Sequence, residues 1–243
     1  MYSCIKSFMD NDKENGLLLL DMPTGFGKTY SVIKYIAEYM KENSNNGKKI
    51  FFITTLKKNL PVDELKRRLD EMELSHLFEE RVIKLESNVD TVIANYDSSM
   101  YNDISLEIRN SEEFKNFKAD VEFLKKHTGQ NSDLVRSVRN NFSNNNERIF
   151  RAYLQNTFAR NFPSIKERLL AIKTDSAWQW VGKLYPSVFT SEKQVIFMSM
   201  DKFICSHSTI VEKSYYFYNS KISNGALVFI DEFDATKGTI LKN

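Results

Sequence analysis

The stretch Met22–Thr29, with the sequence MPTGFGKT, decides how this chain is expected to fold. It follows Gly16–Asp21 (GLLLLD), a short apolar run typical of a buried strand, and it precedes a segment whose apolar residues recur at helical spacing. Glycines let such a loop turn sharply and aim its backbone N–H groups at a phosphate, with the positive end of the following helix behind it. We therefore predict a phosphate-binding strand–loop–helix unit.

The loop side chains have distinct expected roles. Lys28 is placed to contact the outer phosphates of a nucleotide, and the hydroxyl of Thr29 is placed to ligate Mg²⁺. Met22 stands where the pattern G-x-x-x-x-G-K-[ST] has its first glycine, whereas the core T-G-F-G-K-T is intact. The alternative is a glycine-rich turn with an incidental Lys-Thr pair. The remaining residues expected around the nucleotide are Pro23, Thr24, Gly25, Phe26 and Gly27.

A second motif is Ala226–Asp234, with the sequence ALVFIDEFD. A buried strand that ends in two acids suits a metal site at the carboxyl edge of a parallel sheet. Asp231 is expected to position Mg²⁺, and Glu232 to act as the general base that activates a water molecule. Taken alone, the run also fits a strand with a solvated acidic end, but it supplies the metal and base that the phosphate loop lacks.

The remaining chain predicts an α/β domain interrupted by helices. Strand patterns at Lys49–Thr55 and Arg81–Leu85 flank a helical one, which is the order of a mostly parallel sheet. Helical patterns then dominate until strands resume at Gln194–Ser199, with a loop expected at Asn140–Glu147 (NNFSNNNE). We therefore divide the chain into residues 1–90 and 188–243, which form one α/β domain, and a helical insertion at 91–187.

Composition limits the other possibilities. The formal net charge of the 243-residue chain is +2, so a nucleic-acid surface has to be local. Two cysteines suggest a reducing, cytoplasmic setting and are too few for a four-thiolate cluster. The longest aliphatic runs are too short to span a bilayer, so no membrane partner is expected.

These motifs resemble those of superfamily 2 helicases. MPTGFGKT is similar to their motif I, and DEFD (Asp231–Asp234) is similar to their DEAD/DEAH-type motif II. Phe51–Leu60 is similar to motif Ia, which implies nucleic-acid contacts at Thr54, Thr55 and Lys58. The resemblance implies a RecA-like domain that uses ATP and Mg²⁺ and acts on DNA or RNA. It also implies a second RecA-like domain, bearing an arginine finger, beyond Asn243 or on a partner chain.

The insertion contains a basic segment. Residues 131–173 hold eight basic residues and three acidic ones, with aromatic residues between them. Basic residues with aromatics can follow a phosphate backbone and stack bases, but helical spacing favours core packing for the aromatics, and the basic face also fits a plain solvated surface. The arginines expected to contact nucleic acid are Arg136, Arg139, Arg148 and Arg151.

The sequence thus predicts the N-terminal ATP-binding and hydrolysing half of a helicase or translocase, which alone should turn over slowly. Two alternatives stay open. One is a nucleotide-dependent switch, and the other is a P-loop ATPase that remodels a protein partner.

Overall fold

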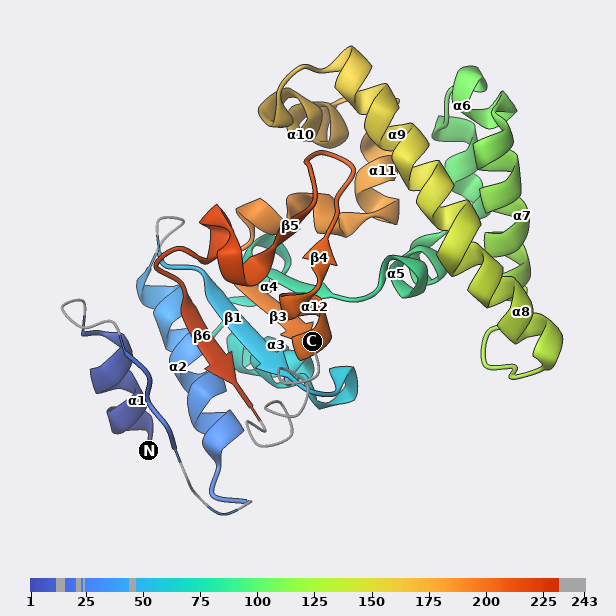
Figure 1. Ribbon diagram of the computed structural model, residues 1–243. Coiled ribbons are helices and arrows are strands. Elements are labelled where there is room, and N and C mark those ends of the chain that lie inside the picture. The colour runs from blue at the N-terminus through green and yellow to red at the C-terminus, as the bar shows by residue number, and fades with distance from the viewer. Residues whose placement is uncertain (12–15, 21–22, 24, 44–46, 232–243) are drawn as a thin grey trace. The chain divides into compact units, whose positions relative to one another are not determined.

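The computed structural model describes residues 1–11, 16–20, 23, 25–43 and 47–231. The chain divides into two compact units. The first, here called the sheet unit, comprises Met1–Leu85, Glu192–Ser206 and Tyr216–Asn243. The second, the helical unit, comprises Glu86–Ser191 and His207–Tyr215. Each unit is described by itself (Figure 1).

The sheet unit is built around a four-stranded parallel sheet with the order β2-β3-β1-β6. Its strands are β1 (Ile50–Thr54), β2 (Val82–Leu85), β3 (Val195–Ser199) and β6 (Leu227–Ile230). Its helices are α1 (Tyr2–Met9), α2 (Lys28–Glu42), α3 (Val62–Glu71), α4 (Ser75–Arg81) and α12 (Met200–Ile204). The short strands β4 (Ser206–His207) and β5 (Tyr215–Tyr216) pair as a separate sheet where the chain passes from one unit to the other. The predicted α/β fold with a mostly parallel sheet is confirmed.

Helical segments cover both faces of the sheet. Alternate strand residues point to opposite faces, so each strand contributes side chains to both layers. Phe52 and Phe197 share a buried cluster with apolar residues of α1, α2, α3 and α4. On the other face, the ring of Phe51 lies 6.0 Å from that of Phe203 in α12 and 5.9 Å from that of Phe217. All residues of β1 and β3 are buried, as expected of strands with helices on both sides.

The prediction of a strand at Gly16–Asp21 is wrong for the residues that the structure describes. Residues 16–20 form no strand, and Leu17 and Leu19 are 74% and 64% exposed. The segment is leucine-rich and has no β-branched or aromatic residue, whereas β1 (IFFIT) and β3 (VIFMS) are rich in them. Such residues favour strands because they fit the pleated surface. The length of the apolar run was therefore a misleading guide.

The helical unit starts earlier than the predicted residue 91 and ends later than residue 187. It also includes His207–Tyr215, a segment that was predicted to belong to the α/β domain. Its helices are α5 (Asn88–Asn95), α6 (Leu106–Asn110), α7 (Glu112–Lys126), α8 (Asp133–Asn141), α9 (Glu147–Asn161), α10 (Ile165–Thr174) and α11 (Gln179–Leu184). Segment 207–215 lies in this unit because Ile210 and Val211 join its apolar core, while Arg168 Nη1 donates to the Val211 carbonyl at 2.9 Å. Across the described part of the chain, no helix is long and apolar enough to cross a membrane.

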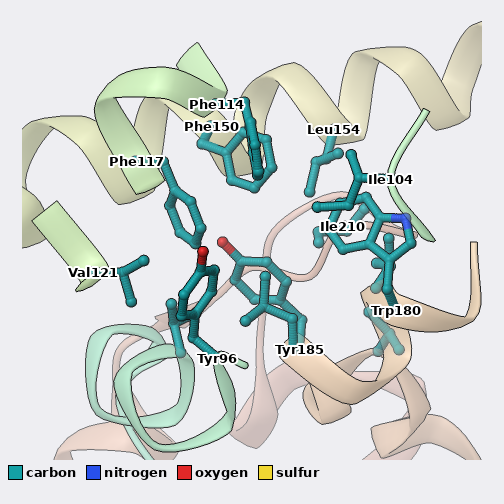
Figure 2. Close-up of a cluster of buried hydrophobic side chains, with 14 of the residues drawn as sticks. Tyr96, Ile104, Phe114, Phe117, Val121, Phe150, Leu154, Trp180, Tyr185 and Ile210 are labelled. Carbon is teal, nitrogen blue, oxygen red and sulfur yellow. The ribbon is translucent and has the colours of Figure 1, made fainter. Parts of the chain in front are cut away.

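Aromatic side chains from several helices form the centre of the helical unit (Figure 2). The rings of Phe117 in α7 and Phe150 in α9 are 4.4 Å apart, and Trp180 in α11 is 6.4 Å from Phe150. Phe150 and Phe158 are fully buried. The interpretation as core residues is therefore confirmed for Phe150 and Phe158, whereas Tyr153 and Phe162 are half-buried and pack against the same core.

The loop predicted at Asn140–Glu147 is also wrong. Helix α8 continues into a π-helical segment, η3 (Phe142–Asn146), and then into α9, so the chain is helical from Asp133 to Asn161. The extra residue per turn brings Asn146 beside α7, where its amide donates to Asp120 Oδ2 at 2.8 Å, and Asn141 donates to the same oxygen at 3.2 Å. Phe142 is fully buried in the core. Burial of one aromatic ring and two amide contacts outweigh the weak helix propensity of asparagine.

Candidate nucleotide-binding site

The glycines of the loop adopt a backbone that other residues rarely adopt. Gly25 has φ +88° and Gly27 has φ +72°, both in the left-handed region. Gly27 also caps the N-terminus of α2, and its carbonyl accepts from the Ser31 amide at 2.9 Å. The turn therefore leads directly into the helix whose first residues are Lys28 and Thr29. This is the arrangement by which a helix N-terminus is placed behind a phosphate group.

The two motifs meet in a hydrogen bond. The hydroxyl of Thr29, in the first turn of α2, donates to Asp231 Oδ2 at 2.9 Å. Asp231 follows β6 directly, and its backbone N–H donates to the Ile53 carbonyl of β1 at 2.9 Å, so the sheet ladder holds its position. The hydroxyl and carboxylate oxygens that were predicted to hold Mg²⁺ thus lie side by side. Hard oxygen donors of this kind are what Mg²⁺ prefers, so the residues fit the ion.

The other residues of the predicted site differ in exposure, and some of them lie outside the described residues. Lys28 is half-buried at the start of α2, Pro23 is exposed, and the Phe26 side chain is 66% exposed. Met22, Thr24, Glu232 and Asp234 lie outside the described residues, so the expected base is assigned from sequence alone.

One neighbour of the loop was not predicted. The guanidinium of Arg68, in α3, lies 4.5 Å above the ring centre of Tyr30, the residue after Thr29. A cation over an aromatic face is a favourable contact, and it links α3 to the first turn of α2. No local sequence pattern joins two residues on successive helices, so only the fold reveals this pair.

The motif Ia residues differ in how they are presented. Thr54 is fully buried, and its hydroxyl donates to the Leu56 carbonyl at 2.8 Å. Its side chain therefore shapes the end of β1. Thr55 is half-buried and Lys58 is exposed, so these two remain able to reach a ligand in solution.

The four arginines predicted to contact nucleic acid also differ. Arg151 pairs with Glu147 at 2.9 Å, and their side chains are 16% and 2% exposed. Arg139 pairs with Asp90, and Arg136 Nε donates to Asn131 Oδ1 at 2.9 Å. Both line a small pocket of about 140 Å³. Arg148 is exposed and makes no ion pair with any residue in the described ranges.

Comparison with known families identifies the chain. A protein-family model described as "Type III restriction enzyme, res subunit" matches residues 2–233, almost the whole sequence. The chain belongs to this family. The chain is therefore a superfamily 2 helicase-like, N-terminal ATPase-type domain and belongs to the hydrolases of the ATPase and helicase type. A search of curated proteins gave no match.

Proposed function

We propose that this chain is the N-terminal half of an ATP-driven nucleic-acid helicase or translocase, and that it binds and hydrolyses ATP with Mg²⁺. The observation that carries this proposal is the 2.9 Å contact between the Thr29 hydroxyl and the Asp231 carboxylate, because it joins the phosphate loop to the acidic strand end. Family membership supports the same reaction class.

Each residue has a proposed role in that reaction. The loop backbone from Pro23 to Gly27 and the Lys28 ammonium bind the phosphates, since a cation and inward-facing N–H groups favour negative charge. Thr29 and Asp231 hold the magnesium ion, which when bound neutralises phosphate charge. Glu232 accepts a proton from the attacking water molecule.

Nucleic acid is the proposed partner on separate grounds. Exposed Lys58 follows β1 at the position where the resemblance implies a backbone contact, and the helical unit supplies a basic segment on a chain of nearly neutral charge. A protein substrate remains the competing proposal, in which the same ATPase site drives remodelling of a polypeptide.

A rate measurement with several ligands tests the proposal. Phosphate release by the full-length protein is followed with ATP and Mg²⁺ alone, and then with single-stranded DNA, double-stranded DNA or RNA. Stimulation by at least one nucleic acid is expected. Hydrolysis without stimulation by any of them favours the protein-remodelling alternative, and absence of hydrolysis and of ATP binding overturns the ATPase proposal.

A further inference from the structure

The outer side of the long helix in the helical unit exposes arginines and asparagines, with a few small or apolar residues among them. Helices α8 and α9 and the π-helical η3 between them run without a break over 29 residues, Asp133–Asn161, which is about 43 Å at 1.5 Å per residue. Figure 1 shows α9 as one long helix beside α7, so one side of it packs inward and the other is open. The residues of α9 that are exposed are Arg148, Ile149, Ala152, Asn156, Ala159, Arg160 and Asn161.

The geometry of α9 puts most of these residues together. At about 100° per residue, Arg148, Ala152, Asn156, Ala159 and Arg160 fall within an arc of about 120°. The arc has arginines at its two edges and short side chains between them. Ile149, 51% exposed, also lies in this arc. A rod-like polyanion could therefore approach the helix backbone closely between two cations.

The charge of this surface is mainly positive, with one exposed acid, Asp133, at the first residue of α8. Between Leu134 and Lys166 the sequence contains five arginines and one lysine, and its single acid is Glu147. Glu147 is 2% exposed and is already paired with Arg151. The outward side of the helix from Leu134 onward therefore presents cations and amides without an exposed carboxylate of its own.

Several donors on this face are uncommitted. Within the described ranges, Arg148 makes no side-chain hydrogen bond or ion pair, and Arg160 makes only a long 3.5 Å contact to the Thr157 hydroxyl. Exposed Asn140 and Asn144, at the π segment, likewise make no side-chain hydrogen bond to a described residue. A π segment within an α-helix is frequently found at functional sites. Here it brings a row of asparagines next to Arg148.

We propose that this outer face, with Arg148, Arg160, Asn140 and Asn144 as its contact residues, binds the sugar–phosphate backbone of the nucleic acid on which the ATPase acts. The inference rests on the proposed function, and it narrows the nucleic-acid contacts of the insertion to residues that the fold leaves uncommitted. Arginine and asparagine donate to phosphate oxygens, and such contacts position a nucleic acid without reading its sequence. The contact residues extend from Asn140 to Arg160, about 30 Å at 1.5 Å per residue, which matches roughly nine base pairs at 3.4 Å each.

Two pairs of substitutions and a matched control test this surface. The variants are Arg148→Gln/Arg160→Gln and Asn140→Ala/Asn144→Ala. The control, Lys126→Gln/Lys183→Gln, removes the same charge from exposed lysines of the same unit that lie outside this face. Binding to labelled oligonucleotides of about 20 nucleotides or base pairs, as single- or double-stranded DNA or RNA, is measured by fluorescence anisotropy across a salt series. Basal ATPase rate is measured on the same samples, because none of these residues belongs to the nucleotide site.

The outcomes distinguish a failure of this inference from a failure of the proposed function. The arginine pair should weaken binding several-fold and lower the salt slope by about 1.4–1.8, since each lost phosphate contact removes about 0.7–0.9. The asparagine pair should weaken binding without changing the slope, because a neutral amide releases no counterion. The control and the basal rates should match wild type. If wild type binds and both variants bind with wild-type affinity and slope, the face is overturned while the ATPase proposal stands. If wild type binds no nucleic acid, the nucleic-acid part of the function fails with it.

Discussion

The Thr29 hydroxyl donates a 2.9 Å hydrogen bond to the Asp231 carboxylate, although 202 positions separate the two residues in the chain. Thr29 is the second residue of α2 and Asp231 directly follows β6, so the contact depends on β1 and β6 pairing in register as far as Ile53 and Ile230. The same two oxygens are proposed to hold Mg²⁺. The pairing of β1 and β6 therefore also determines whether the two proposed metal ligands lie close together.

Removing the Thr29 hydroxyl should therefore abolish the effect of magnesium on nucleotide binding. Thr29→Val keeps the branched shape and removes the oxygen, whereas Thr29→Ser keeps the oxygen. Titration of a fluorescent ATP analogue with and without Mg²⁺ should show a magnesium-dependent gain in affinity for wild type and the serine variant, and little gain for the valine variant. An unchanged magnesium dependence in Thr29→Val would show that this hydroxyl is not a metal ligand.

Lys28→Ala should weaken Mg-ATP binding without unfolding the protein. Loss of a charge-assisted contact of about 1.5–3 kcal/mol corresponds to roughly 10- to 150-fold in dissociation constant. Lys41→Ala is the matched control, because Lys41 is an exposed lysine in the last turn of the same helix. Equal affinities for the two variants would count against the phosphate-loop assignment.

The strong sequence signals and the weak ones had different physical origins. The helix after the loop, and the strands at β1, β2, β3 and β6, were predictable because buried periodic patterns leave few alternatives. The Thr29–Asp231 contact was predictable in kind, since parallel strands end at one edge of a sheet. The Arg68–Tyr30 pair was not, because it depends on how two helices lie against each other.

The failures are equally physical. At Gly16–Asp21 the apolar run indicated a strand, but a strand also requires a backbone partner, and leucine favours strands weakly. At Asn140–Glu147 the asparagines indicated a loop, but burial of Phe142 and the amide contacts to Asp120 keep the chain helical. Local propensity is a weak guide where tertiary contacts compete with it.

Glu232→Gln should separate nucleotide binding from turnover. The amide keeps the size of the side chain but cannot accept a proton from water, and general base catalysis typically contributes about 10²–10⁴-fold. Phosphate release by the full-length protein should fall by that order, while ATP affinity stays within about twofold of wild type. A variant that hydrolyses ATP at the wild-type rate would mean that another group takes the proton.

Arg151→Ala should destabilise the helical unit far more than Arg148→Ala, although both residues lie on α9. Arg151 Nε donates to Glu147 Oε1 at 2.9 Å, and the Glu147 side chain is only 2% exposed. Burial raises the pKa of the nearby Tyr185 hydroxyl, and the negative charge of Glu147 raises that pKa further, so this part of the core already disfavours a second anion. Without Arg151 the Glu147 carboxylate is left buried and unpaired, which typically costs about 3–5 kcal/mol. Arg148 is exposed, and its loss should change stability by no more than about 0.5 kcal/mol.

Urea denaturation followed by far-UV circular dichroism compares the two variants. The double substitution Glu147→Leu/Arg151→Met should recover most of the lost stability, because a hydrophobic pair leaves no buried charge. Equal unfolding midpoints for Arg151→Ala and Arg148→Ala would mean that the Glu147–Arg151 pair does not stabilise the core.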